Sequence, residues 1–181
     1  MANVKKILGI TALIGILVAV SYKGASFYKK LKQASGNIMF DVSFLRIYGL
    51  VGEGITKFIS PTVRVLFNLE LKNFSGLNIE ITDIFARIDF SKNGGKDWAS
   101  VASAINRLTI NSKDGSQINK ELTFDFKGIS TITSLINKTN KHRIVLTYNL
   151  KGQQLQFIKE IDISGPLSAF WKKQSGGSLI V

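Results

Sequence analysis

The feature that most constrains the fold is a regular alternation of apolar and polar side chains, because this pattern fits a β-strand with one buried face. From Val63 to Leu71 the odd-numbered residues are apolar, whereas Arg64, Asn68 and Glu70 lie on the opposite face. Residues 38–44 alternate in the same way. The pattern therefore predicts a domain built mainly from half-buried strands.

The alternation is interrupted in two informative places. After residue 44, Gly49, Gly52 and Gly54 predict a glycine-rich link, which ends at Ser60-Pro61. Within residues 79–90 the apolar positions change from odd to even numbers between Ile81 and Ile84. Since a slip of one residue would turn every following side chain to the wrong face, we expect a β-bulge near Thr82-Asp83.

Turn residues and spacing organise the remainder of the domain. Asn93-Gly94-Gly95 and Asp114-Gly115 each predict a hairpin turn, with two weaker strands between them in residues 98–110. Residues 129–137 have the apolar spacing of a short helix, and two strands around a turn at Lys151-Gly152 close the domain. The expected fold is mainly β: a seven- to eight-stranded antiparallel β-sandwich with one short helix.

An uncharged apolar run near the N-terminus predicts a membrane anchor helix before this sandwich. Residues 7–20 span about 21 Å as a helix, and continuing to residue 28 gives about 33 Å, against ~30 Å of bilayer hydrocarbon. The anchor residues are Ile7, Leu8, Ile10, Leu13, Ile14, Ile16, Leu17, Val18 and Val20. The expected interfacial residues are Lys5, Lys6, Tyr22, Lys23, Phe27, Tyr28, Lys29 and Lys30.

Two other interpretations of this run remain open. A cleaved signal peptide would have a similar apolar length, with Ala19-Val20-Ser21 before the cut, and a run this short also suits a buried core helix. The length and the basic flanks favour the uncleaved anchor. Thr11, Gly15 and Ala19 would form a small-residue stripe for helix packing, although small residues are common in membrane helices in any case.

The position of the positive charge bears on the partners. Residues 1–36 contain six lysines and no acidic residue, so they carry +6 of the formal net charge of +12. Residues 37–165 carry +4 and the tail from residue 166 carries +2. Because lysines beside an apolar run meet lipid phosphates, the bilayer is the expected partner, and nucleic acid is not favoured. The charge difference across the run is too small to fix the orientation in the membrane.

The sequence contains no pattern that predicts catalysis or a cofactor. There is no cysteine and a single histidine, His142, so zinc sites of the usual kinds cannot be built. Since His142 stands between Lys141 and Arg143, we expect it to be a solvated surface residue. Asp83 and Asp89 are expected on a solvated sheet face. The prediction is a non-enzymatic protein without metal or cofactor.

The expected organisation is an anchor and basic neck (1–36), a sandwich domain (37–165) and a C-terminal tail (166–181). The tail combines aromatic, lysine and terminal apolar residues, which suits a contact with a neighbouring subunit or a membrane as well as a frayed terminus. Its candidate contact residues are Phe170, Trp171, Leu179, Ile180 and Val181.

The pattern of residues 63–165 resembles the late-embryogenesis-abundant group 2 family, also called the water-stress and hypersensitive-response domain. The sequence LFNLELKNFSGLNIEI (66–81) takes the place of that family's strand–turn–strand, with Asn73-Phe74 where Asn-Pro usually stands. The sequence LTYNLKGQQLQFIKEIDISG (146–165) resembles its closing strand pair. The resemblance implies a seven-stranded sandwich, frequently behind an N-terminal apolar segment, and no catalytic site.

Two functions fit these features. The first is a single-pass membrane protein with a structural role in a larger assembly, such as a minor virion protein linking an internal membrane to a capsid, or a component of a bacterial envelope complex. Its partners would be other subunits, including copies of itself. The alternative is a membrane-anchored envelope or stress binding module of the late-embryogenesis-abundant group 2 type.

Overall fold

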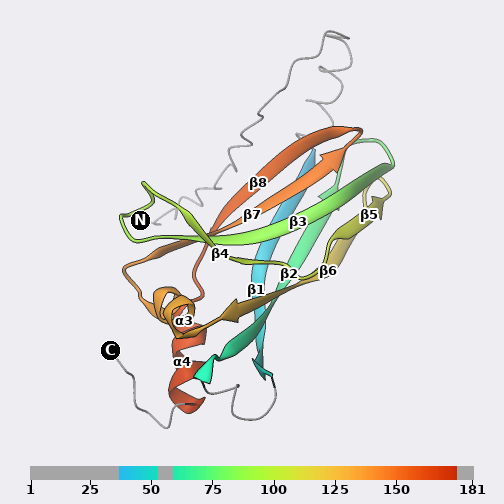
Figure 1. Ribbon diagram of the computed structural model, residues 1–181. Helices are drawn as coiled ribbons and strands as arrows, with labels where there is room; N and C mark the ends of the chain where they lie inside the picture. Colours follow the sequence, from blue (N-terminus) through green and yellow to red (C-terminus); the bar gives the residue numbers. More distant parts are fainter. Residues whose placement is uncertain (1–36, 53–58, 175–181) are drawn as a thin grey trace, which may run out of the picture.

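The computed structural model describes residues 37–52 and 59–174, which form eight strands and two helices (Figure 1). In chain order these are β1 (Ile38–Val51), β2 (Thr62–Asn73), β3 (Ile79–Ser91), β4 (Ala99–Ser103), β5 (Leu108–Ser112), β6 (Gln117–Lys127), α3 (Ile129–Ile136), β7 (Lys141–Leu150), β8 (Gln153–Ile161) and α4 (Ser164–Gln174). The predicted mainly β architecture is confirmed. The expected anchor helix lies outside the described residues.

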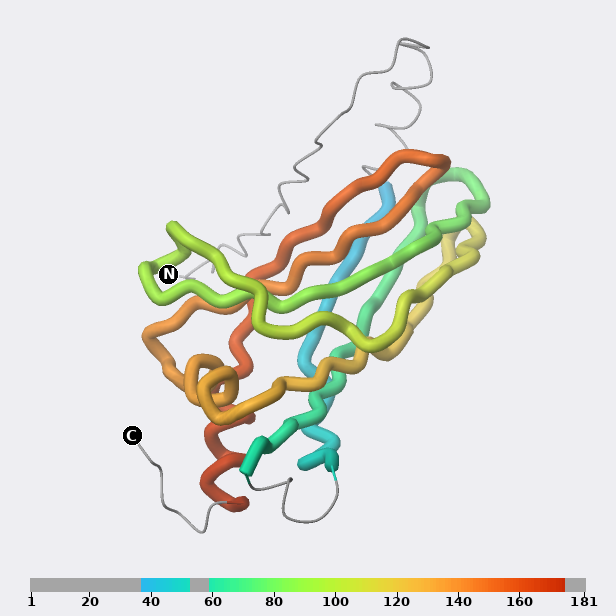
Figure 2. The backbone as a smooth tube through the Cα atoms, in the orientation of Figure 1, coloured from blue at the N-terminus to red at the C-terminus, as the bar shows by residue number. Residues whose placement is uncertain are grey.

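The strands form two facing antiparallel sheets (Figure 2). The first has the order β1-β2-β6, and the second has the order β4-β3-β7-β8, with β5 also paired to β3. Because β4 and β5 pair with successive parts of β3, they lie one after the other along the same edge of that strand. Two short strands therefore exist close to the expected residues 98–110, but each pairs with β3 and they do not pair with each other.

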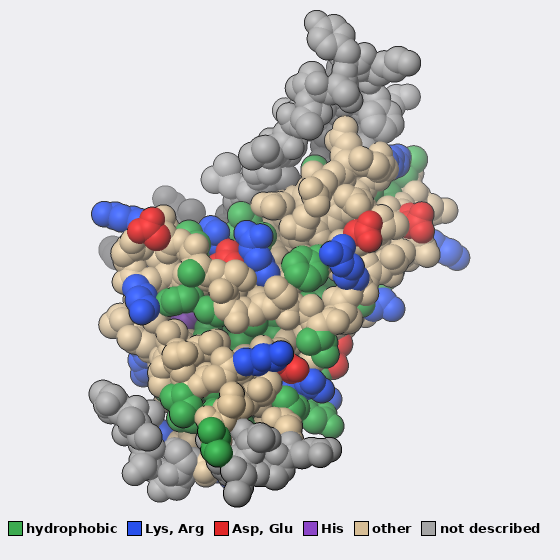
Figure 3. Space-filling view, in the orientation of Figure 1, with side chains coloured by type: hydrophobic (Ala, Val, Ile, Leu, Met, Phe, Trp, Pro, Cys, Tyr) green, Lys and Arg blue, Asp and Glu red, His purple; other side chains and the backbone are tan. Residues whose placement is uncertain are grey.

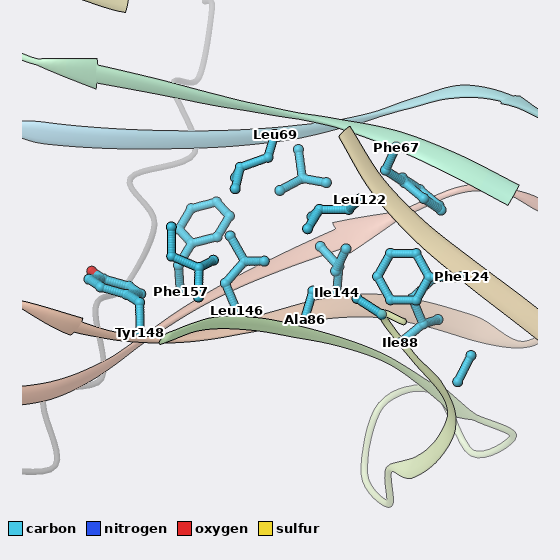
Figure 4. Packing of buried hydrophobic residues seen from close by; sticks show 14 of the residues in the cluster. Phe67, Leu69, Ala86, Ile88, Leu122, Phe124, Ile144, Leu146, Tyr148 and Phe157 are labelled. Carbon is cyan, nitrogen blue, oxygen red and sulfur yellow. The ribbon is translucent and has the colours of Figure 1, made fainter. Parts of the chain in front are cut away.

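The core lies between the two sheets, where the alternating apolar residues meet (Figure 4). Phe67 and Phe124 from the first sheet pack edge to face, with ring centroids 5.5 Å apart. Ile88 and Leu146 from the second sheet are fully buried against the same cluster. The sequence alternation thus buries one face of each sheet, as the sandwich prediction requires.

The two long sides of the sandwich are closed differently. On one side Ala104 forms a β-bridge with Phe124, and the Ile105 N–H donates to the carbonyl of Thr123 at 3.0 Å, so the backbone connects the sheets. On the other side β1 faces β8, and side chains fill the gap. There the Phe40 ring lies 4.7 Å from that of Tyr148, and the Lys159 ammonium donates to the Val42 carbonyl.

The predicted bulge in β3 is confirmed. The register of β3 shifts between Ile81 and Ile84 against β5, and between Thr82 and Phe85 against β7. Asp83 adopts a left-handed backbone conformation, with φ of 51°. The extra residue keeps both Ile81 and Ile84 in the core, which is why the apolar parity of the sequence changes there.

Two expectations about connections are wrong. The glycine-rich link does not begin after residue 44, because β1 continues to Val51 and absorbs two irregularities opposite β2, so Gly49 lies in a strand. Gly52 follows the strand, and Gly54 lies outside the described residues. The Asp114-Gly115 turn is not a hairpin turn, since it joins β5 in one sheet to β6 in the other. The turn at Asn93-Gly94-Gly95 does join a paired hairpin, β3 and β4.

The two helices cover one end of the sandwich (Figure 1). The predicted short helix is confirmed as α3, and it buries Ile132 and Leu135. Helix α4 buries Leu167 in the same core cluster. The Asp162 carboxylate precedes α4 and accepts bonds from the Ser164 N–H at 3.0 Å and the Ser164 hydroxyl at 2.7 Å. These bonds satisfy polar groups at the start of the helix.

Candidate interaction surfaces

The end of the sandwich opposite the helices is made of connections between strands, and we call it the loop end. It comprises Asn37 and residues 73–78, 113–116 and 151–152. In Figure 1 the links from β2 to β3, from β5 to β6 and from β7 to β8 gather there. The described chain therefore begins at this end.

Asn73 holds these connections together from a fully buried position. Its side-chain amide donates to the carbonyl of Leu77 at 2.8 Å and to that of Ser112 at 3.2 Å. Its side-chain oxygen accepts from the Ser75 N–H and hydroxyl at 3.1 and 2.6 Å. Its backbone N–H donates to the carbonyl oxygen of Ser116 at 3.0 Å. One amide thus fixes two loops that are far apart in the sequence.

Two apolar side chains remain exposed on the loop that Asn73 orders. Phe74 is 55% exposed and Leu77 is 47% exposed, and Met39 is exposed on the neighbouring strand β1. The Phe74 N–H donates to the carbonyl of Asn37 at 2.9 Å, so Phe74 lies beside the start of the described chain. Figure 3 shows apolar and basic side chains next to each other at this end. Such clusters are typical of contact surfaces.

The sequence analysis did not predict this exposed apolar cluster. Residues 72–76 contain Asn, Ser and Gly, which predict a turn and nothing further. The signal that could have identified the surface is the pair Phe74 and Leu77, since large apolar side chains are unusual in a polar turn and have no place in the alternating pattern.

At the opposite end, which we call the helical end, His142 contradicts the sequence prediction. It is 3% exposed, and its Nε2 lies 3.4 Å from the carbonyl oxygen of Ser134. The physical reason is register: His142 is in phase with Ile144 and Leu146 on β7, so it points to the buried face. Burial is the main cause that lowers the pKa of His142 below its usual value of 6.5.

A pocket of about 390 Å³ lies beside His142, between the start of β7, the end of β8 and the start of α4. Lys138, Lys141, Glu160 and Asp162 contribute charges of both signs to its wall. The bonds from Ser164 lower the pKa of Asp162, which is therefore ionised at neutral pH. Mixed charges of this kind select neither an anion nor a cation.

The outer face of the second sheet has a groove of about 420 Å³. Its walls are mostly polar, and the Asn149 amide donates to the Asp83 carboxylate at 2.9 Å. The Arg107 guanidinium lies over the Phe85 ring at 5.2 Å. The complete lining consists of Asp83, Phe85, Arg87, Arg107, Thr147, Asn149, Gln154 and Gln156.

Asp89, on the same outer face, is not solvated as expected. It is 2% exposed and pairs with Arg87 at 3.1 Å and with Arg143 at 3.0 Å. The Arg143 guanidinium in turn lies 4.2 Å from the centre of the Trp98 ring. The two arginines compensate the buried carboxylate, which gives Asp89 a structural role.

The residues predicted as contacts fall in different places. Phe170 and Trp171 lie on α4, where both are partly buried against the core. The proposed anchor, interfacial and helix-packing residues, together with Leu179, Ile180 and Val181, lie outside the described residues.

Two further findings concern residues 37–52 and 59–174 alone. Neither of the two helices there has the length and apolar character needed to cross a bilayer. No three His, Asp or Glu side chains in these ranges are grouped so that they could hold a metal ion.

Comparisons with known proteins add only a distant likeness of fold. No family model matches the chain, and no curated protein matches it significantly. A crystal structure of a protein from Archaeoglobus fulgidus is similar at 14% identity and a TM-score of 0.41, over 68% of this chain and 92% of that one. The sporulation control protein Spo0M from Bacillus subtilis is similar at 13% identity and a TM-score of 0.44, over 70% of this chain and 49% of that one.

A β-glucuronidase from glycoside hydrolase family 2 is similar at 13% identity and a TM-score of 0.39, over 65% of this chain and 11% of the enzyme. The chain thus spans about half the length of Spo0M and about a tenth of the glucuronidase. Likenesses at this distance support no statement about function. The class that the described residues define is a mainly β, sandwich-like domain.

Proposed function

We propose that this chain is a non-enzymatic, single-pass membrane protein whose β-sandwich serves as a structural subunit of a larger assembly. Settings that fit are a virion, where it would link an internal membrane to a capsid, and a bacterial envelope complex. The sequence of residues 5–32 supports the membrane part of the proposal, because an apolar run flanked by lysines suits a short anchor. The fold supports the structural part.

The observation that carries the proposal is where the chain joins the sandwich. Asn37 lies at the loop end, so a preceding anchor would attach the domain by that end. Strand β7 is ten residues long, which corresponds to about 33 Å. The helical end is therefore displayed at a fixed distance from the attachment point, which suits a spacer between a membrane and a second layer.

The helical end offers surfaces for the second layer. Ile129 on α3 and Lys172 and Lys173 at the end of α4 are exposed. The tail that follows, including Leu179, Ile180 and Val181, would supply further contacts to a neighbouring subunit.

The membrane part is tested by comparing the full-length chain with a variant that lacks residues 1–36. We expect the full-length chain to float with membranes and to need detergent for solubility, whereas the shortened chain stays in solution. Equal solubility of both chains without detergent would contradict the anchor. N-terminal sequencing of the mature protein would separately reveal cleavage near Ser21.

The structural part is tested by purifying the native membrane complex or particle. A subunit should co-migrate in fixed stoichiometry with its neighbours through successive fractionations. Free monomers in all fractions would contradict the structural role.

The polar groove on the second sheet favours a second candidate, a membrane-anchored binding module of the late-embryogenesis-abundant group 2 type. The groove suits a polar ligand, because its lining includes Asp83, Arg107, Asn149 and Gln154. The same purification separates the two candidates, because a binding module would float with membranes but would not co-migrate in fixed stoichiometry.

A further inference from the structure

We propose that the loop end lies against the membrane surface, with Phe74 and Leu77 inserted among the lipid headgroups. This inference rests on the proposed function, because it needs the N-terminal anchor. It adds the orientation of the sandwich and assigns a partner to its exposed apolar cluster.

The first argument is the length of the tether. If the membrane segment ends at Tyr28, eight residues remain before Asn37, and they reach at most about 28 Å when fully extended. The chain enters the sandwich beside Phe74, since the Asn37 carbonyl accepts from the Phe74 N–H at 2.9 Å. This link holds the loop end within about 28 Å of the end of the membrane segment.

The second argument is the chemistry of the surface. Phe74, Leu77 and Met39 are exposed together at the end that the tether holds. Lys113 and Lys151 are exposed on the two neighbouring turns, and Asp114 is exposed next to Lys113. Aromatic and aliphatic side chains bordered by lysines suit the boundary between headgroups and acyl chains, where lysine binds phosphate.

The third argument is that the loop is already ordered. The buried Asn73 side chain bonds to Ser75 and Leu77 on either side of Gly76, and the Gly76 N–H donates to the Asp114 carboxylate at 2.9 Å. Insertion therefore costs little further loop entropy, because the backbone that carries Phe74 and Leu77 is already ordered by these bonds. The hydrogen bonds also leave the loop's own backbone partly satisfied when it meets lipid.

The experiment uses the absence of native cysteine, so that one introduced thiol can carry a fluorescent label. Phe74→Cys and Leu77→Cys are made separately in the full-length chain, labelled with nitrobenzoxadiazole and reconstituted into vesicles of phosphatidylcholine and phosphatidylglycerol. Ile129→Cys is the matched control, because Ile129 is also exposed and apolar but lies at the helical end. Each labelled chain is also measured in vesicles containing a doxyl-labelled lipid, which quenches the label on contact.

We expect labels at positions 74 and 77 to become brighter, to shift their emission to the blue and to lose this emission in doxyl-lipid vesicles. The label at position 129 should keep the emission of an aqueous site. Bright labels at 74 and 77 without quenching would indicate burial against a second copy or another protein, and would overturn the inference. Dim labels at both positions, or quenching at position 129 alone, would overturn it as well.

Vesicle flotation of the same samples separates the two proposals. If the labelled chains float but the labels at 74 and 77 stay dim, the anchor stands and only the orientation is wrong. If the chains do not float, the proposed membrane attachment itself fails. Unchanged thermal melting of each labelled variant establishes that the loop end has kept its structure.

Discussion

The two ends of the sandwich are closed by different physical means. At the helical end, Ile132, Leu135 and Leu167 from two helices extend the apolar core. At the loop end, the hydrogen bonds of Asn73 join the connections between strands. Because polar bonds close the loop end, the apolar side chains on its loops are not needed in the core, and Phe74 and Leu77 remain outside. An exposed apolar cluster can thus stand on a well-ordered loop.

The same substitution made at both ends gives the largest expected contrast. Leu135→Ala removes a fully buried side chain and leaves a cavity, so we expect the free energy of unfolding to fall by about 2–5 kcal/mol. Leu77→Ala acts on an exposed loop residue and should change it by less than about 0.5 kcal/mol. Denaturant unfolding of the full-length chain in mild detergent, followed by circular dichroism, measures both. Equal losses of unfolding free energy would contradict the view that apolar packing closes the helical end while hydrogen bonds close the loop end.

Asn73→Ala tests whether polar bonds close the loop end. The variant removes the donor of the Leu77 and Ser112 carbonyls, and we expect a loss of about 1–3 kcal/mol in the free energy of unfolding. Hydrogen exchange should accelerate at the Ser75 amide, which loses its acceptor. The matched control is Asn68→Ala, because the Asn68 side chain makes only an exposed bond to Asn119 at 3.1 Å. A loss no larger than that of the control would show that the loops are held by other contacts.

Local patterns in the sequence predicted the parts of this fold that depend on neighbouring residues. Alternation identified the strands, and the change of parity between Ile81 and Ile84 located the bulge, because register is encoded in which residues are apolar. The helical spacing of residues 129–137 likewise predicted α3. The same reasoning applied to β7 would have placed His142 inside, since it shares the parity of Ile144. The prediction that His142 is solvated is wrong because it rests on the charges of Lys141 and Arg143 and not on this parity.

Features that depend on distant residues could not be predicted in this way. The burial of Asp89 depends on Arg143, which lies on another strand and pairs with the carboxylate together with Arg87. The Asp114-Gly115 turn has hairpin chemistry, but the sheet to which each flanking strand belongs is decided by its packing partners. The apolar cluster at the loop end also depends on distant residues. It lies beside the start of the described chain because the Phe74 N–H bonds to the Asn37 carbonyl.

The smallest expected effect is a pH dependence of the free energy of unfolding that arises at the helical end, from His142. Burial holds the pKa of His142 below 6.5, so the unfolded chain binds the proton more tightly than the folded chain. Stability is therefore fully present above pH 6.5 and is lost as the pH falls below it, until the lowered pKa of the folded state is reached. One group of this kind contributes a slope of at most about 1.4 kcal/mol per pH unit. Unfolding measured between pH 7 and 5 should show the loss.

His142→Gln is the variant that assigns this loss to the helical end, because glutamine does not titrate in this range. We expect its stability to vary less between pH 7 and 5 than that of the parent chain. The neighbouring Asp162 has a pKa below its usual 3.8 in the folded chain. Its contribution to the free energy of unfolding is therefore fully present above pH 3.8, and it is lost as the pH falls from 3.8 through the lowered pKa of the folded state. Between pH 7 and 5 the free energy of local opening at the Ser75 amide, measured by hydrogen exchange, should stay constant, since the loop end contains no histidine. A pH dependence that persists in the variant would place the titrating group elsewhere.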